Sequence, residues 1–203
     1  MVHILPQGVG VSPERTQPMK DTKIQKLAVS AVMLALATVL SMIKVYQLPL
    51  GGSITLLSML PICVVALRYG MGWGFGIAFL HGCIQLGMGL AEVMSWGLTP
   101  LVFTGSVFFD YLIPCTVLGF AGLFRKNGAA GICTGICIAM VLKFIAHFIS
   151  GAFLFAAWCP EGWNVYWYSV VYNGSYCLPE LIFTMAASVM LFKLPQTKKI
   201  LGV

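Results

Sequence analysis

Charged side chains are scarce in this 203-residue chain: Asp, Glu, Lys and Arg make up 9% of it, and only six residues are acidic. A soluble domain carries about 25% charged residues. Hydrophobic residues make up 59%, so a soluble protein of this length could not cover its surface with polar groups. The shortage of charge excludes a soluble globular enzyme, a disordered chain and a free nucleic-acid-binding protein. It leaves an integral membrane protein.

Several signatures of soluble enzymes are also missing. The sequence has no phosphate-binding P-loop, so the chain does not hydrolyse ATP by that route. It shows no Ser-His-Asp or metalloprotease motif. The seven cysteines lie mostly in apolar stretches, where Cys behaves as a small hydrophobic residue. We therefore expect no metal site, no cofactor and no disulfide framework, and any active transport must draw its energy from a partner or an ion gradient.

Six apolar segments follow a polar N-terminal region. Residues 1–23 lack the apolar core of a signal peptide, and we expect them to form a disordered cytoplasmic tail. A membrane-spanning helix needs about 20 apolar residues, and the second segment is shorter, so it is expected to be tilted, irregular or partly re-entrant. The sequence predicts an all-α integral membrane protein with six transmembrane helices in one domain over residues 24–203. The apolar segments are residues 27–43, 54–67, 73–90, 101–124, 131–157 and 166–194.

Basic residues indicate how the chain is oriented in the membrane. Lys and Arg occur in the N-terminal tail, near Arg68, at Arg125 and near the C-terminus, whereas two of the alternate loops carry Glu92 and Glu161. Basic loops remain cytoplasmic. Both termini are therefore predicted to be cytoplasmic, in a multi-pass protein of the cell membrane, and the connections after the first, third and fifth spans face outward.

Ionisable side chains within the apolar segments are the first candidates for a functional site. A charge at membrane depth costs from about 2.5 kcal/mol upward and usually faces the interior of the bundle. Asp110 lies in the fourth segment, and Lys143 and His147 lie four residues apart in the fifth, which places them on one helix face. With Asn173 from the sixth segment they predict a polar pocket open to the outside. The alternative is an Asp110–Lys143 ion pair that only fixes helix packing.

Aromatic residues crowd the outer end of the fifth segment and the loop beyond it. They either form an interfacial belt or build a cage around a flat or cationic ligand, because aromatic faces attract cations. Trp163 and Tyr168, which lie in or beside the polar loop, are the better candidates for a cage.

Two further patterns have open interpretations. The loop over residues 48–53 is too apolar for a simple solvated turn, and it either folds over the outer mouth as a lid or forms a tight connection before a short helix. In the first segment, Ala31 and Ala35 form a small-xxx-small pair, which lets another helix approach closely.

Four stretches carry a resemblance to a known family. They are GGSITLLSMLPI (51–62), FDYLIPCTVLGFAGLFRK (109–126), LKFIAHFISGAFLF (142–155) and YWYSVVYNGSYCLP (166–179). From about Lys23 onward the chain resembles the thiamine-specific substrate-binding subunits (S-components) of energy-coupling factor (ECF) transporters, the ThiT family. The acidic-Tyr-Leu, Lys-x-x-x-His and Tyr-x-x-x-x-Asn motifs occur in order at compatible spacings.

The resemblance implies a six-helix membrane subunit that is not an enzyme and that binds thiamine near the outer face. It implies association with a transmembrane coupling subunit and two cytoplasmic ATPases, with Ala31 and Ala35 at the docking surface. The loop around Gly52 and Ser53 corresponds to a lid over the substrate. Here Gly52 and Leu56 stand where some members have Trp and Glu. The other implied pocket residues are Asp110, Tyr111, Lys143, His147, Phe155, Tyr168 and Asn173, to which the cage argument adds Trp163.

Thiamine suits such a pocket because it combines a cationic thiazolium ring with an aminopyrimidine. A carboxylate can offset the cation, and Asn173 offers amide hydrogen bonds. Lys143 is expected to pair with Asp110 or to line the hydroxyethyl end of the ligand. The alternatives are an S-component for another vitamin or a thiamine precursor, an intramembrane enzyme using Asp110, Lys143 and His147 as acid–base groups, and a structural scaffold.

Overall fold

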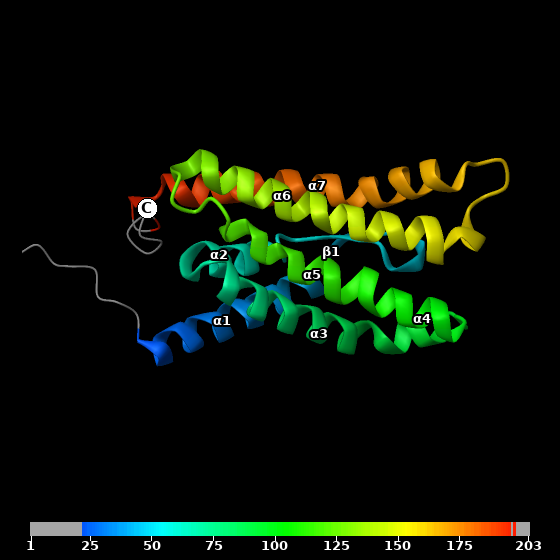
Figure 1. The fold of residues 1–203 in the computed structure, drawn as a ribbon, viewed down its shortest axis with the longest axis horizontal. Helices are drawn as coiled ribbons and strands as arrows, with labels where there is room; N and C mark the ends of the chain where they lie inside the picture. The colour runs from blue at the N-terminus through cyan, green and yellow to red at the C-terminus, as the bar shows by residue number, and fades with distance from the viewer. Residues whose placement is uncertain (1–21, 196, 198–203) are drawn as a thin grey trace, which may run out of the picture.

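The structure is a computed structural model that describes residues 22–195 and 197 (Figure 1). Residues 1–21 of the expected N-terminal tail lie outside the described residues. The first helix begins at Lys23, where Thr22 and Gln25 form a reciprocal capping box that satisfies free N–H groups of the first turn. The elements of the first half are α1 (Lys23–Met42), β1 (Lys44–Gln47), η1 (Pro49–Gly51), β2 (Ser53–Thr55), α2 (Leu60–Tyr69) and α3 (Met71–Ser95).

The second half of the chain forms three further long helical segments, two of which change helical type along their length. The fourth predicted span is a continuous run of α4 (Pro100–Ser106), η2 (Val107–Leu112), α5 (Ile113–Thr116) and η3 (Val117–Gly122). The fifth is α6 (Gly128–Ile149) with η4 (Ser150–Leu154), followed by η5 (Ala156–Trp158), and the sixth is α7 (Val165–Lys193).

Five helical segments of the described chain are long and apolar enough to cross a membrane, so the helical membrane fold is confirmed while the count of six spans is not. The exception is α2, which has ten residues and a length of about 15 Å. A bilayer core is about 30 Å thick. The second apolar segment is short because residues 53–55 pair as a strand instead of extending the helix.

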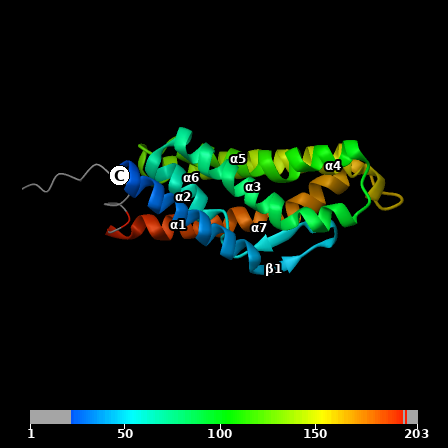
Figure 2. The same cartoon turned by 90° about the horizontal axis from the view of Figure 1, so that it is seen from below.

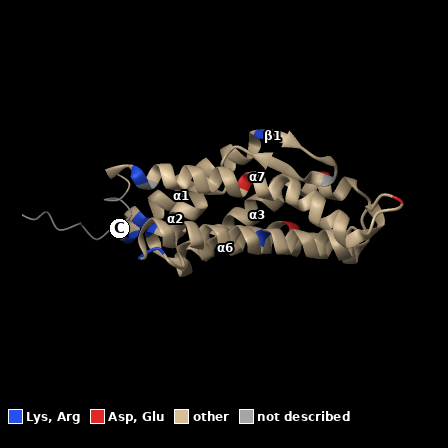
Figure 3. Ribbon diagram, turned by 90° about the horizontal axis from the view of Figure 1, so that it is seen from above, with Lys and Arg blue, Asp and Glu red and all other residues tan. Residues whose placement is uncertain are grey.

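The long helices run side by side along one axis (Figures 1 and 2). The fourth span packs between α3 and α6, α7 packs against α6, and α1 packs against α2 and α3. The start of α1 and the end of α7 lie at the same end of the bundle, and Lys and Arg gather at this end (Figure 3). This clustering fits the rule that basic residues remain cytoplasmic; the orientation itself remains a prediction.

The packed core lies between α2, α3, η3 and α6. Small residues let these helices approach closely, as at Gly74 of α3, where an added Cβ would lie 2.6 Å from the Cβ of Ala66 in α2. At Gly135 of α6 it would lie 2.5 Å from the carbonyl oxygen of Ala121. Van der Waals packing is a main source of helix association in lipid, so these contacts hold the bundle together. The largest fully buried apolar side chains are Ile62, Leu118, Ile132, Ile136 and Val65.

The first connection is a β-hairpin, a short two-stranded addition to the all-helical membrane bundle. Strands β1 and β2 are antiparallel, with Tyr46 opposite Ile54 and Gln47 opposite Ser53. The 3-10 turn η1 forms the tip, where Gly51 has a φ of +88°, a conformation that favours glycine. The sequence missed these strands because each has four residues or fewer.

The fourth and fifth spans each contain a π-helical segment. Val107–Leu112 is π-helical and ends just before Pro114, which has no N–H to donate to the carbonyl of Asp110. Ser150–Leu154, which directly follows the C-terminal end of α6, is the second π-helical segment. Wide turns of this kind occur often at functional sites, and these two carry Asp110 and Ser150.

The close contact at Gly74 predicts the outcome of a matched pair of substitutions in α3. Gly74→Ala forces a methyl group against Ala66, and we expect it to lower the free energy of unfolding by about 1–3 kcal/mol. Gly76→Ala is the control, since an added Cβ there meets nothing within 4 Å. Thermal unfolding in detergent measures both, and equal melting temperatures for the two variants would contradict the packing described here.

Candidate functional site

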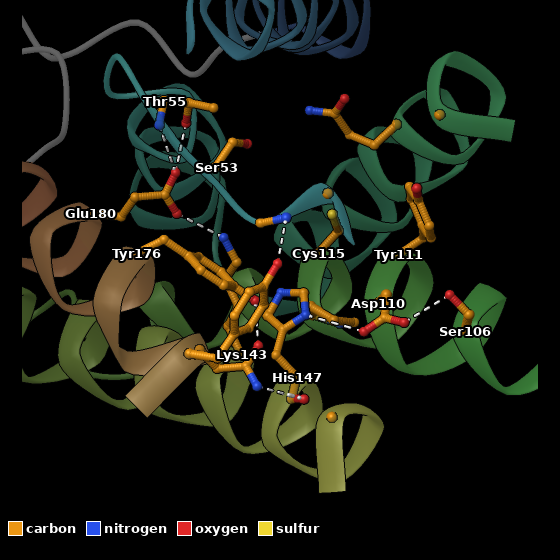
Figure 4. Close-up of a pocket in the computed structure, with 18 of the residues that line it drawn as sticks. Ser53, Thr55, Ser106, Asp110, Tyr111, Cys115, Lys143, His147, Tyr176 and Glu180 are labelled. Carbon is orange, nitrogen blue, oxygen red and sulfur yellow. Dashed lines mark hydrogen bonds and ion pairs between the residues drawn. The ribbon is translucent and has the colours of Figure 1, made fainter. Parts of the chain in front are cut away.

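A cavity of about 460 Å³ lies between the hairpin and the long helices (Figure 4). Small-molecule sites have volumes of about 300–1,000 Å³. Its walls come from β2, α3, the fourth span, α6 with η4, and α7, so segments far apart in the sequence contribute to it. Most of the residues that line it are polar or aromatic, and glycine lines it at the hairpin. They include Ser41, Gly52, Ser53, Thr55, Gln85, Trp96, Ser106, Asp110, Tyr111, Lys143, His147, Phe155, Trp158, Tyr168, Ser169, Tyr172, Asn173, Tyr176 and Glu180.

Asp110 provides a carboxylate on the wall of the cavity. One carboxylate oxygen, Oδ2, accepts hydrogen bonds from the Ser106 and Ser150 hydroxyl groups, both at 2.7 Å. The other, Oδ1, lies 3.4 Å from Nδ1 of His147 (Figure 4). Ser106 precedes Asp110 by one turn, and Ser150 comes from the facing π-helical segment. The two hydroxyl groups orient the carboxylate and leave its Oδ1 side directed toward the imidazole.

Lys143 and Glu180 form a buried ion pair, which corrects the expectation that Lys143 pairs with Asp110. The Lys143 Nζ atom lies 2.9 Å from Oε2 of Glu180, and the two residues are 5% and 4% exposed. The other oxygen of Glu180 accepts hydrogen bonds from the backbone N–H and hydroxyl of Thr55, at 3.2 and 2.7 Å. Glu180 is therefore the partner of Lys143, whereas Asp110 contacts Ser106, Ser150 and His147.

Asn173 is committed to the protein, contrary to the expectation that its amide is free for a ligand. Its Nδ2 group donates to the carbonyl oxygens of Ser169 at 2.9 Å and His147 at 3.2 Å. Its Oδ1 atom accepts a 2.6 Å hydrogen bond from the Tyr176 hydroxyl. Asn173 therefore holds α7 against α6 and orients Tyr176, whose ring packs edge-on against His147 with centroids 5.7 Å apart.

One face of α7 supplies a row of aromatic rings. Tyr168, Tyr172 and Tyr176 follow at intervals of four residues, and Glu180 continues the row. Neighbouring rings in the row have centroids 5.9 and 6.0 Å apart. All four residues line the cavity, so this face offers aromatic surface above a buried charge.

A second aromatic group lies where α3 and η4 end. The rings of Phe155 and Trp96 pack edge to face with centroids 6.1 Å apart, and Phe155 and Trp158 are 5.2 Å apart. All three line the cavity. Trp163 does not: it is 49% exposed, and its ring packs against the outer side of the row at Tyr168, 6.1 Å away.

Every binding residue expected from the sequence, apart from Trp163, lines this cavity. Sequence patterns did not indicate roles for Trp96, Tyr172, Ser106 or Ser150, and they did not pair Glu180 with Lys143. The four-residue spacing of the α7 row was a usable signal for Tyr172. No signal identified the serines, because Ser is common in membrane helices.

His81 and Gln85 also contribute to the structure on this side. His81 is fully buried, and its Nε2 atom lies 3.3 Å from the Gln85 amide nitrogen. Gln85 in turn accepts a 3.3 Å hydrogen bond from Ser41 of α1. A hydrogen bond between side chains therefore joins α3 to α1. Within residues 22–195 and 197, no group of three His, Cys, Asp or Glu side chains is placed to hold a metal ion.

A family model described as "Thiamine transporter protein" (Thia_YuaJ) matches residues 27–200 of the chain. The thiamine transporter ThiT of Bacillus subtilis (strain 168) is 27% identical over 187 residues, covering 85% of this chain and 93% of that protein. The thiamine transporter ThiT of Lacticaseibacillus paracasei is 30% identical over 154 residues, covering 68% of this chain and 73% of that protein.

The fold is similar to a solved structure, that of ThiT from Listeria monocytogenes. The TM-score is 0.72 with 23% sequence identity, and the match covers 88% of this chain and 98% of the other. This likeness establishes the arrangement of the helices.

The buried ion pair predicts how two variants differ in stability. Glu180→Gln leaves the Lys143 ammonium buried without a carboxylate, and we expect a loss of about 3–5 kcal/mol in the free energy of unfolding. A double variant, Lys143→Met with Glu180→Leu, removes both charges, so it should be more stable than the single variant. Thermal unfolding in detergent measures the order of stability, and a single variant as stable as the wild type would contradict the pairing.

Proposed function

The chain belongs to the thiamine transporter protein family, and from that premise we propose that the cavity beneath the hairpin is its thiamine site. As a multi-pass membrane protein of this family it serves thiamine uptake as an S-component, and it is a transport component rather than an enzyme. We further propose which residues bind thiamine and which partners supply the energy for uptake.

The observation that carries the proposal is the Asp110 carboxylate in a cavity lined by aromatic rings. Thiamine carries a permanent positive charge on its thiazolium ring. A carboxylate neutralises such a charge most strongly where water is largely excluded. Aromatic faces at Tyr168, Tyr176 and Phe155 add cation–π attraction of about 0.5–2 kcal/mol each. Tyr111 and His147 complete the surroundings of the carboxylate.

The ion pair between Lys143 and Glu180 supports a cationic ligand for a second reason. A free ammonium on the cavity wall would repel thiazolium, and Glu180 removes that repulsion. Gly52 and Ser53 close the cavity from the hairpin side. We propose that Trp163 acts through Tyr168, against which it packs, and does not contact the ligand.

The arrangement of charges also argues against an intramembrane acid–base enzyme. Lys143 pairs with Glu180, whereas His147 lies beside Asp110, so the three groups named for such an enzyme do not form one set. A neutral vitamin or an uncharged thiamine precursor could donate hydrogen bonds to Asp110 but would gain no attraction between opposite charges from it. Competition by the uncharged hydroxymethylpyrimidine portion of thiamine tests this difference.

Energy for uptake is proposed to come from an ECF coupling subunit and two cytoplasmic ATPases. The sequence has no P-loop of its own. Ala31 and Ala35 lie exposed on α1, where small side chains let a partner helix approach closely. We propose that this stripe contacts the coupling subunit.

Replacing the carboxylate tests the thiamine site. Asp110→Asn keeps the shape of the side chain and removes its charge, so we expect thiamine affinity to fall by roughly 10- to 100-fold, in line with one desolvated charge contact. Glu161→Gln is the control, because Glu161 is exposed in the outer loop. Isothermal titration of purified protein measures both affinities, and equal affinity in the wild type and Asp110→Asn would remove Asp110 from the site.

A substitution on α1 tests the docking surface separately from binding. Ala35→Leu should leave thiamine affinity within about twofold and abolish co-purification with the coupling subunit and ATPases, because a bulky side chain prevents close helix packing. Ala186→Leu, at an exposed position of α7, is the matched control. An intact complex with Ala35→Leu would place the docking surface elsewhere.

A further inference from the structure

The hairpin depends on the helices to hold it over the cavity. All four residues of β1 are exposed, whereas β2 is half-buried to buried. A two-stranded hairpin is at best marginally stable by itself in water. Residues Gly51, Gly52, Ser53 and Thr55 line the cavity, so the contacts of the hairpin with the helices decide whether the cavity is covered.

The base of the hairpin is fixed in a buried place. Thr55, the last residue of β2, donates its backbone N–H and hydroxyl to Glu180, and its hydroxyl lies 2.6 Å from that of Ser58. Because Glu180 also pairs with Lys143, moving the base would expose a buried ion pair. We therefore expect the base of the hairpin to remain bound to Glu180 when the tip moves.

Tyr172 of α7 forms side-chain hydrogen bonds to the tip, where the Trp96 ring also lies close to Gly51. The Tyr172 hydroxyl accepts a hydrogen bond from the backbone N–H of Gly52 at 3.2 Å and donates one to the carbonyl oxygen of Pro49. The two bonds join both sides of the η1 turn to one atom. Tyr172 is half-buried, so this contact is closer to water than the one at Thr55.

Gly52 lies so close to α7 that a side chain at this position would crowd two tyrosines. An added Cβ would lie 2.8 Å from the Tyr172 hydroxyl oxygen and 3.0 Å from the Tyr176 ring. The first distance is shorter than real Cβ contacts and the second is tighter than most of them, so a side chain here would require the hairpin tip or the tyrosine side chains to shift. The glycine at position 52 and the tyrosine at 172 form one matched pair.

We propose that Tyr172 is a positioning residue whose hydroxyl acts as a latch that holds the hairpin tip over the cavity. Breaking and re-forming this latch sets the rate at which thiamine enters and leaves. Tyr172 and Glu180 lie two turns apart on one face of α7, so one helix holds both ends of the hairpin. The tip, which has the more exposed contact, opens first about the fixed base. The role in thiamine exchange rests on the proposed function; the latch itself does not.

Hydrogen exchange of the ligand-free protein tests the latch without thiamine. Tyr172→Phe keeps the ring and removes the hydroxyl, so amides in residues 47–55 should exchange roughly ten-fold faster or more, as expected for the loss of two hydrogen bonds. Tyr166→Phe removes a hydroxyl from an exposed residue of the same helix and should exchange as the wild type does. Unchanged exchange in Tyr172→Phe overturns the proposal.

Thiamine kinetics separate a latch from a direct ligand contact. If Tyr172 is a latch, Tyr172→Phe raises both the association and the dissociation rate constants of radiolabelled thiamine, each by several-fold. An increase in dissociation alone means that the hydroxyl contacts thiamine directly, and it overturns the latch. A wild type that does not bind thiamine refutes the proposed function, while the exchange experiment still decides the latch.

A second variant guards against misfolding of the first. Gly52→Ala disturbs the same contact from the hairpin side, so it should accelerate exchange in residues 47–55 in the same direction. Combined with Tyr172→Phe, it should add less than its single effect, because both changes break one contact. If the effects of the two substitutions on amide exchange add in full, Gly52 and Tyr172 do not act as one contact and the proposed pairing is overturned.

Discussion

Every polar side chain placed inside this apolar bundle needs a partner, and the pairing of Lys143 with Glu180 is the contact on which the site depends. An unpaired ammonium at that depth would cost several kcal/mol and would repel a cationic ligand. With the pair formed, Lys143 does not engage the Asp110 carboxylate, which contacts Ser106, Ser150 and His147 instead. The same Glu180 anchors Thr55, so one carboxylate connects the electrostatics of the site to the position of its cover.

The site combines a rigid part with a less rigid part. Asn173 joins α6 to α7 through hydrogen bonds that leave its amide little freedom, and the serine hydroxyl groups orient Asp110. Such preorganisation lowers the entropy lost on binding. The hairpin, by contrast, contacts the helices through few groups. A site that must both hold and release a ligand needs preorganised walls and a cover that can move.

Long apolar runs predicted the helical membrane fold, and charges at membrane depth together with the family resemblance predicted part of the cavity wall. They could not choose the partner of Lys143, since Asp110 and Glu180 lie on different helices and only the three-dimensional packing decides between them. They also missed the hairpin, whose strands are too short to show a clear alternation. The fit of Gly52 against Tyr172 joins residues 120 positions apart and leaves no local pattern.

The shortness of α2 has a consequence for the volume of the protein interior. Its ten residues fill only about half of the depth that a full span occupies, and Thr55, Ser58 and Met59, which immediately precede it, border the cavity. The chain therefore reaches α2 as a strand and a turn rather than as a helix, and the residues of this non-helical stretch form part of the cavity wall. A shortened span thus leaves room, at the level of the hairpin, for side chains of several helices to border one chamber.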